Sequence, residues 1–137
     1  MSLNKITPLF ATDKLAEAKA FYTTHFGFRA YFETACFLGL RHTEDWKLEL
    51  SYMAPSPGDE HTPAVPAASP DGMYYVLSVD DVDAEHERLS AAGVTIDEAP
   101  EDMPWGDRRM TLTDPVGMRL YLCHPIEVAA EFAGAAK

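Results

Sequence analysis

Glu49 is the residue whose type and position most favour chemistry, because it lies between Leu48 and Leu50 in a short apolar strand. A carboxylate on a half-buried strand can pair with a cationic group of a ligand. It can also act as a general base if burial raises its pKa. Alternatively it is structural, in an ion pair or hydrogen bond with a residue such as Arg109 or Tyr121. The residues alone leave these alternatives open.

Two tryptophans and one arginine are further candidates for ligand binding. Trp105 lies in a predicted loop, 100–106, and Trp46 in the corresponding predicted turn, 42–46. Aromatic rings on loops can hold planar ligands and attract cations to the ring face. Either ring can instead cap the core or a dimer contact. Arg109 can bind an anionic group of a ligand or form an internal salt bridge.

No side chain is an evident nucleophile. The chain has no Gly-x-Ser-x-Gly elbow, no phosphate-binding loop and no cysteine with an adjacent catalytic base. Cys36 and Cys123 belong to no Cys-x-x-Cys pair, so we expect reduced thiols in a cytosolic protein.

The elements that must position these residues occur twice along the chain. ITPLFATD (6–13) leads into the helical pattern LAEAKAFY, and YYVLSVDD (74–81) leads into VDAEHERLSAAG. Each half ends in an apolar–x–apolar strand, LEL at 48–50 and LYL at 120–122. The connections between the later strands are too short for parallel crossovers, which favours antiparallel pairing. The pattern predicts an α+β fold of two similar modules that share a cleft.

The expected boundaries follow from apolar periodicity and from the positions of glycine and proline. We expect strands at 5–10, 28–33, 35–41, 47–53, 72–79, 94–97, 108–113 and 118–124, a helix from 15 that Gly27 ends, and a helix at 82–92 capped by Asp80 or Asp81. Residues 54–72 hold five prolines and predict a linker. The predicted organisation is one domain, 1–137, with module one at 1–53, the linker at 54–72, module two at 73–125 and a tail at 126–137.

Charge and hydropathy exclude some classes of function. The 22 acidic and 11 basic residues give a net charge of −11, which argues against nucleic-acid binding because phosphates require clustered lysine and arginine. No apolar run approaches the length of a membrane-spanning helix, and the first residues contain no signal-like segment. We therefore expect a cytoplasmic protein that binds neither nucleic acid nor membranes.

Three segments together resemble the vicinal oxygen chelate superfamily, which includes glyoxalase I, bleomycin-resistance proteins and extradiol dioxygenases. The segments are Asp13 with Leu15 and the AFY…FGF pattern at 20–28, VDDVDA…AGV at 79–94, and WG…R…DPVG…L at 105–120. The resemblance implies two βαβββ modules whose sheets curl around a shared cleft. It also implies a homodimer.

The resemblance does not extend to a metal site. Metal-dependent members place ligands at four strand positions, which Ile6, Glu49, Tyr74 and Tyr121 occupy here. Isoleucine has no donor atom and neutral tyrosine is a poor ligand, whereas a catalytic metal of this kind needs three protein ligands. The five histidines form no HxH or HxxxH pair. We therefore expect no metal and no cofactor.

If the four family positions face the cleft, residues two apart on each strand face it too. This predicted lining is mixed polar and aromatic, as in a ligand site, and comprises Ile6, Pro8, Phe10, Lys47, Glu49, Ser51, Tyr74, Val76, Ser78, Arg109, Thr111, Thr113, Arg119 and Tyr121. The opposite faces are almost wholly apolar and should pack under the helices: Leu48, Leu50, Tyr52, Tyr75, Leu77, Val79, Met110, Leu112, Leu120 and Leu122. Tyr74 and Tyr121 should face each other across the cleft, either to orient a ligand or to fill the space of the missing metal.

The leading hypothesis is a metal-independent binding protein of the bleomycin-resistance type, which sequesters an aromatic or cationic small molecule in the cleft of a homodimer. Its candidate ligand-binding residues are Glu49, Tyr74, Trp105, Arg109, Tyr121, Trp46, Ser51 and Phe10. The alternative is a lyase or isomerase with Glu49 as general base and Tyr74 or Tyr121 as electrophile. Metal-dependent glyoxalase or dioxygenase chemistry is a third possibility that needs ligands the sequence does not offer. The identity of the ligand or substrate stays open.

Overall fold

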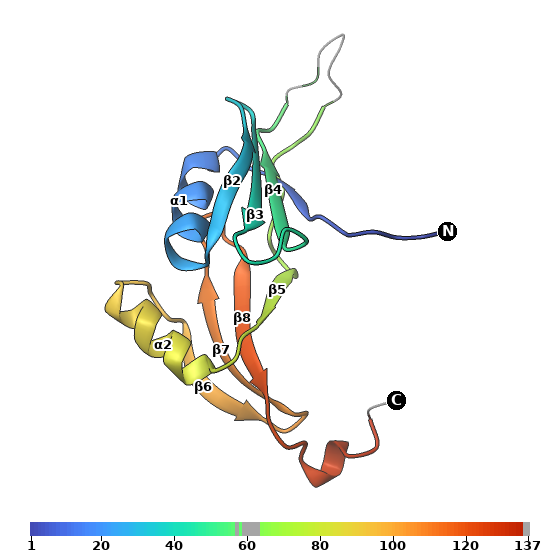
Figure 1. Cartoon of the computed structure of the whole chain (residues 1–137), viewed down its shortest axis with the longest axis vertical. Coiled ribbons are helices and arrows are strands. Elements are labelled where there is room, and N and C mark those ends of the chain that lie inside the picture. Colours follow the sequence, from blue (N-terminus) through green and yellow to red (C-terminus); the bar gives the residue numbers. More distant parts are fainter. Residues whose placement is uncertain (57, 59–63, 136–137) are drawn as a thin grey trace. The chain divides into compact units, whose positions relative to one another are not determined.

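The computed structural model of this protein describes residues 1–56, 58 and 64–135 (Figure 1). The chain forms two compact units, unit one at Met1–Ser69 and unit two at Pro70–Lys137. Part of the predicted linker, at 57 and 59–63, lies outside the described residues. Its described flank returns to unit one, because the N–H of Ala68 donates to the carbonyl of Ala11 at 2.8 Å.

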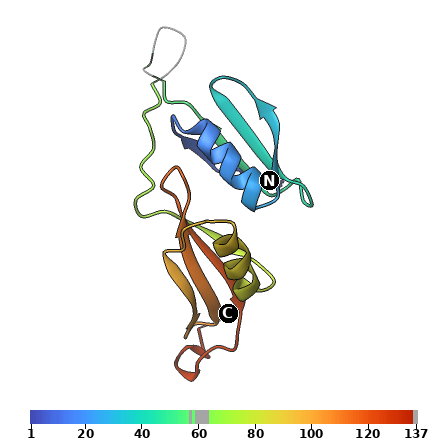
Figure 2. The same cartoon turned by 90° about the vertical axis from the view of Figure 1, so that its left-hand side faces the viewer.

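Unit one is a four-stranded sheet with one helix. Its elements are β1 (Leu9–Ala11), α1 (Leu15–His25), β2 (Phe28–Glu33), β3 (Phe37–His42) and β4 (Glu49–Met53). The strand order is β1-β4-β3-β2. β1 runs parallel to β4, and the other neighbours are antiparallel. Helix α1 lies against one face of this sheet (Figure 2).

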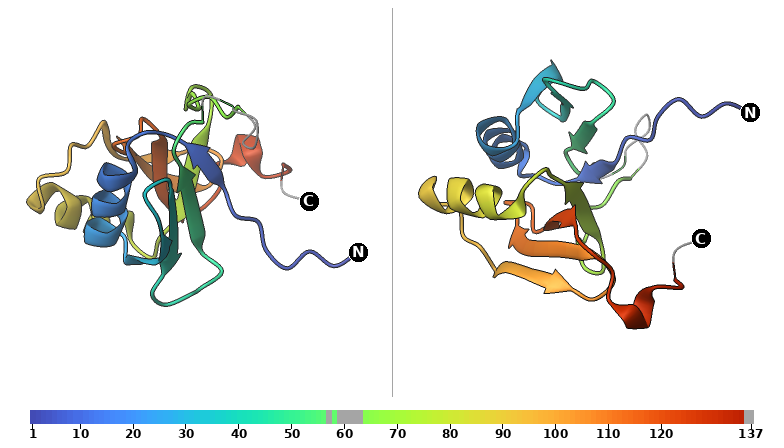
Figure 3. Two further views of the ribbon diagram at one scale, coloured as in Figure 1. Left: turned by 90° about the horizontal axis from the view of Figure 1, so that it is seen from above. Right: turned by 60° about the horizontal axis from the view of Figure 1, so that its bottom comes forward.

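Unit two repeats this arrangement. Its elements are β5 (Tyr74–Ser78), α2 (Val82–Ala91), β6 (Glu98–Met103), β7 (Asp107–Thr113), β8 (Arg119–Pro125) and a 3-10 helix (Ala130–Phe132) in the tail. The strand order is β5-β8-β7-β6, with β5 parallel to β8. Helix α2 lies against one face of the sheet (Figure 3). The repeated order confirms the predicted α+β fold of two βαβββ modules.

The core of each unit lies between its helix and its sheet. In unit one, Tyr22 of α1 is fully buried and stacks on Tyr52 of β4, with ring centroids 6.3 Å apart. In unit two, Val82 and Leu89 of α2 are fully buried, as are the helix-facing residues of the sheet, Met110, Leu112, Leu120 and Leu122. Six of the ten residues of the predicted apolar face therefore belong to the core. Tyr75, Leu77 and Val79 are half-buried, and Leu48 precedes β4 and is 52% exposed.

Local signals place the second helix where the sequence predicts it. The Asp81 carboxylate accepts from the N–H groups of Asp83 and Ala84, which satisfies donors of the first turn. The Nδ1 atom of His124 on β8 accepts from the N–H of Val82 at 2.9 Å, and so ties the helix start to the sheet. Gly93, with φ of +83°, ends the helix region in a conformation that favours glycine.

Two predicted strands were wrong. The first strand is Leu9–Ala11 rather than 5–10, because its ladder with β4 begins where Leu9 pairs with Ser51. The strand predicted at 94–97 is absent, and β6 (Glu98–Met103) instead uses residues expected in a loop. This strand is polar and contains Pro100, and its pairing with β7 shifts register between Glu98 and Glu101. An edge strand tolerates proline at such a bulge, because no ladder hydrogen bond requires its missing N–H.

Among the described residues, no helix is long and apolar enough to cross a membrane.

Candidate functional site

The candidate site in unit one lies on the face of the sheet opposite α1, which we call open face one. Alternation along β4 directs Leu50 and Tyr52 toward α1, and Glu49 and Ser51 toward open face one. Glu49 is 7% exposed and Ser51 is 5% exposed. A carboxylate at this depth must be paired or hydrogen-bonded to stay ionised.

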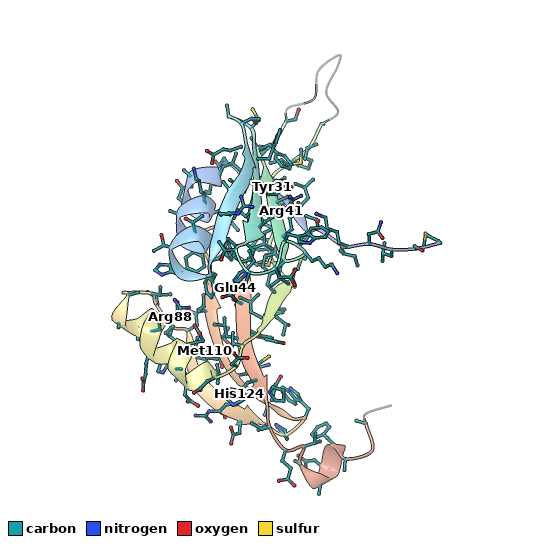
Figure 4. The ribbon with its side chains drawn as sticks, in the orientation of Figure 1. Tyr31, Arg41, Glu44, Arg88, Met110 and His124 are labelled. Atoms are coloured by element: carbon teal, nitrogen blue, oxygen red, sulfur yellow. The ribbon has the colours of Figure 1, made fainter. Side chains whose placement is uncertain are left out.

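Three side chains of unit one satisfy the Glu49 carboxylate. Lys5 forms an ion pair with Oε2, and the Tyr31 hydroxyl donates to Oε1. Arg41 Nε donates to Oε2 at 3.3 Å from the adjacent strand β3, where Arg41 is the register partner of Glu49. Figure 4 shows Tyr31 and Arg41 lying next to each other, and the Arg41 guanidinium carbon lies 3.7 Å from the Tyr31 ring centroid.

These contacts decide the protonation states of the cluster. Burial by itself pushes the pKa of Glu49 upward, but the hydrogen bonds from Lys5, Tyr31 and Arg41 outweigh it and lower the pKa below its ordinary value. The hydrogen bond to Glu49, together with burial, raises the pKa of Tyr31, so its hydroxyl stays protonated and donates. The arrangement is an ionised carboxylate held by two cations and a neutral phenol.

A glycine makes room for the phenol. A Cβ built on Gly39 of β3 would lie 2.7 Å from the Tyr31 ring, which is closer than real Cβ contacts. Tyr31 therefore reaches Glu49 by crossing a position without a side chain. At the other end of the cluster, Lys5 Nζ lies 5.4 Å from the ring centroid of Trp46, which is 55% exposed.

The candidate site in unit two lies on the face of its sheet opposite α2, which we call open face two. The rings of Tyr74 on β5 and Tyr121 on β8 stack there, with centroids 4.7 Å apart and planes inclined by 22°. The Arg109 guanidinium carbon lies 4.2 Å from the Tyr121 ring centroid and 5.5 Å from that of Trp105. The Arg119 guanidinium carbon lies 6.0 Å from the Tyr74 ring centroid.

The surroundings of open face two are partly exposed. Trp105 is 49% exposed and packs edge-on against Phe132 of the tail at 6.3 Å. Tyr74 is 39% exposed. Cys123 on the same face is buried, and burial raises the pKa of its thiol, which disfavours the thiolate.

The structure groups the predicted site residues in two sets. Glu49, Ser51 and Trp46 belong to open face one, and Tyr74, Tyr121, Arg109 and Trp105 belong to open face two. Phe10 belongs to neither set, and the prediction that it shares a face with Glu49 was wrong. Phe10 pairs in register with Tyr52 and is buried with it on the helix side, because the ladder with β4 sets the face of each β1 residue.

Two further expectations need correction. Tyr74 and Tyr121 do not face each other across a cleft, since they lie on adjacent strands of one sheet and stack side by side. The partners of Glu49 are Lys5, Tyr31 and Arg41 rather than Arg109 or Tyr121, and its pKa is lowered rather than raised.

Sequence reasoning missed Lys5, Tyr31 and Arg41. A signal for Arg41 was available, because positions 41 and 49 flank the predicted turn at 42–46 and a hairpin with that turn brings them opposite each other. No comparable signal exists for Lys5 or Tyr31, which lie 44 and 18 residues from Glu49.

The four positions that correspond to family metal ligands do not fit a metal centre within either unit. Both oxygens of Glu49 accept hydrogen bonds, and two cations beside it oppose a further positive ion. Ile6 offers no donor atom and is 76% exposed, while Tyr74 and Tyr121 contact each other through their ring faces. In the part of the chain that the structure describes, no group of three or more His, Cys, Asp and Glu side chains could hold a metal ion.

Comparison with known proteins supports the fold along most of the chain. The family model of the Glyoxalase/Bleomycin resistance protein/Dioxygenase superfamily matches residues 3–122. An uncharacterized protein of Mycobacterium bovis is 38% identical over 69 residues, which cover 50% of this chain and 44% of that protein. The match thus spans less than half the length of that relative.

Solved structures share the fold at low sequence identity. A glyoxalase/bleomycin resistance protein/dioxygenase from Nocardioides has a TM-score of 0.72 and 24% identity, covering 93% of this chain and 87% of that one. A bleomycin-binding protein complexed with bleomycin has a TM-score of 0.62 and 24% identity, covering 89% of this chain and 98% of that one. With the fold and the family model in agreement, this chain belongs to the Glyoxalase/Bleomycin resistance protein/Dioxygenase superfamily.

Proposed function

We propose that this protein binds and sequesters a small aromatic molecule without a metal and without catalysing a reaction. The observation that carries the proposal is open face two, where two stacked tyrosines, a half-exposed tryptophan and an arginine form a platform outside the core. Partly exposed rings of this kind match the flat face of an aromatic ligand. A relative of the same fold was solved in complex with bleomycin, so ligand binding occurs in this family.

The proposal is tested by tryptophan fluorescence. The full chain is titrated with metal-free bleomycin and with a library of planar aromatic compounds that carry negative, zero or positive charge. We expect saturable quenching by at least one compound, and we expect Trp105→Phe to abolish it. Trp46→Phe is the matched control, because Trp46 lies beside Lys5 in the other unit and should leave the response in place. A flat response to every compound would refute the proposal.

A second candidate is a lyase or isomerase with Glu49 as general base, and one observation favours it. Glu49 is buried, ionised and hydrogen-bonded to the Tyr31 phenol, an arrangement that can pass a proton. The lowered pKa makes Glu49 a weak base, and Lys5 and Arg41 already engage it, which is why we rank this candidate second. Turnover of an oxoaldehyde–thiol adduct by the wild type, abolished in a folded Glu49→Gln variant, would reverse the ranking.

The homodimer remains part of the proposal, and sedimentation at several protein concentrations measures it. Stoichiometric nickel, iron, manganese or zinc in the purified protein, measured by elemental analysis, would contradict the proposed metal independence.

A further inference from the structure

Open face two carries two arginines, Arg109 and Arg119, that pair with no carboxylate among the described residues. Unit two has four arginines among its described residues, and two of them are paired: Arg88 with Glu85, and Arg108 with Asp83 and Asp102. Among the described residues, Arg109 and Arg119 have ring contacts but no ion pair or hydrogen bond. In a chain with 22 acidic and 11 basic residues, carboxylates are in excess, yet none pairs with these two.

The two arginines lie beside the stacked tyrosines. Arg109 contacts the Tyr121 ring, Tyr121 stacks on Tyr74, and Arg119 is the register partner of Tyr74. A guanidinium stacked on a ring keeps the N–H groups along its edge available for a planar oxyanion. The arrangement thus combines a stacking surface with free donors at its rim.

The described carboxylates on the same face do not pair with Arg109. Glu101 is its exposed register partner on β6, and no ion pair joins the two in the described part of the chain. Asp107 lies two residues before Arg109 on β7 and on the same face, but forms no ion pair with it among the described residues. Asp107 Oδ1 is buried and has no hydrogen-bond partner in the described structure. Asp107 raises and Arg109 lowers the pKa of Cys123, which is the register partner of Arg109 on β8.

We infer that open face two binds planar aromatic molecules that carry an oxyanion such as a carboxylate, with the ring on Tyr74 and Tyr121 and the oxyanion on Arg109. This inference rests on the proposed function and narrows its ligand class. In the sequence, Glu49 suggested a cationic ligand. The structure does not favour that, because Lys5 and Arg41 already neutralise the Glu49 carboxylate. A cationic ligand on open face two would instead meet two unpaired guanidinium groups.

The test uses three probes of one shape and different charge: 2-naphthoate, 2-naphthamide and 2-naphthylmethylammonium. Their dissociation constants for the full chain are measured by isothermal titration calorimetry. We expect 2-naphthoate to bind at least about tenfold more tightly than the amide, since charge-assisted bonds to arginine exceed neutral ones. The ammonium probe should bind most weakly. Raising the salt from about 0.05 M to about 0.5 M should weaken only the binding of 2-naphthoate appreciably.

Variants assign the preference to one residue. Arg109→Gln should remove the tenfold preference for 2-naphthoate over 2-naphthamide. Arg109→Lys keeps the positive charge but lacks the planar guanidinium, so it should retain part of the preference for 2-naphthoate. It replaces the glutamine variant if that variant does not fold. Arg88→Gln is the matched control, since Arg88 lies on α2 and pairs with Glu85. It should bind all three probes like the wild type.

The outcomes separate this inference from the proposed function. Equal affinity for 2-naphthoate and 2-naphthamide, or tighter binding of the ammonium probe, overturns the anionic ligand class while small-molecule binding stands. Binding of none of the three also overturns the inference, whereas the proposed function falls only if the fluorescence titrations with bleomycin and the library are flat as well.

Discussion

Open face one and open face two are built on sheets of the same strand order, yet they handle positive charge differently. On open face one, Lys5 and Arg41 converge on the buried carboxylate of Glu49. On open face two, the corresponding strand β8 presents Tyr121, and Arg109 lies on its ring instead of on a carboxylate. The two faces thus differ in one residue of the last strand. Glu49 on β4 forms an ion-pair cluster, whereas Tyr121 on β8 leaves the guanidinium groups without a carboxylate partner among the described residues.

The comparison suggests different roles for the two faces. A carboxylate whose two oxygens are both engaged mainly stabilises its own unit, because any ligand must first displace those partners. An arginine that contacts only rings loses no ion pair when it meets a ligand. We therefore expect variants on open face one to change stability, and variants on open face two to change binding.

The largest effect is expected from Glu49→Ala. The change leaves Lys5 and Arg41 without their carboxylate beside a buried position, and we expect a loss of about 2–3 kcal/mol in the free energy of unfolding. This is below the loss of about 3–5 kcal/mol for a fully buried pair, because Lys5 and Arg41 are 27% and 31% exposed. Urea denaturation measures the difference.

Glu33→Ala is the matched control for this measurement. Glu33 pairs with Lys19, but both side chains are more than 40% exposed, so its loss should cost less than about 1 kcal/mol. Equal costs for the two variants would show that the Glu49 cluster is not a stabilising centre.

Acid should remove the contribution of Glu49. Its pKa is lower in the folded state than the ordinary value of 4.5, so the folded state holds the carboxylate ionised more strongly than the unfolded state does. The resulting stability is present above about pH 4.5 and is lost as the pH falls through the folded pKa. The stability difference between wild type and Glu49→Gln should therefore shrink from pH 7 to pH 3.

The comparison with Glu49→Gln isolates the contribution of the Glu49 carboxylate to the pH dependence of stability. Asp83 also has a lowered pKa because of Arg108, but it is present in both proteins and cancels in the difference. A difference between the two proteins that stays constant across this range would contradict the assignment.

A smaller effect is expected from Gly39→Ala. The added Cβ would meet the Tyr31 ring at 2.7 Å, so the ring must move away from Glu49. Overpacking of this kind costs about 1–2 kcal/mol, and the raised pKa of Tyr31 should return toward its ordinary value. Denaturation and a spectrophotometric titration of the tyrosines measure the two effects. Gly134→Ala, where nothing lies within 4 Å of the new Cβ, should change neither.

The smallest effect is expected on open face two. A double-mutant cycle of Tyr74→Ala and Tyr121→Ala should give a coupling energy of about 0.5–1 kcal/mol in stability, typical of a stacked aromatic pair. Tyr74→Ala paired with Glu87→Ala on α2 should give none. A coupling energy as large as the cost of Glu49→Ala would mean that open face two is also built for stability.

Much of the fold could be predicted from residue patterns. The repeated strand–helix–strand motif, the apolar residues of the core and the Asp81 cap all depend on local periodicity or on neighbours within one turn. The predictions were wrong where pairing with a neighbouring strand determines the position or the face of a strand. Phe10 was assigned to the wrong face, and β6 formed from polar residues, because in both cases pairing with β4 or β7 set the strand.

The sequence by itself determined the family, the order of the elements and the face of most strand residues, because a period of two residues separates the two sides of a strand. Only the tertiary structure decided what Glu49 and Arg109 contact. Their neighbours come from other strands and from the N-terminal segment, so register and loop path, rather than spacing along the chain, bring them together. That is why Glu49, the most conspicuous residue of the sequence, is already neutralised, and why Arg109 has no carboxylate partner among the described residues.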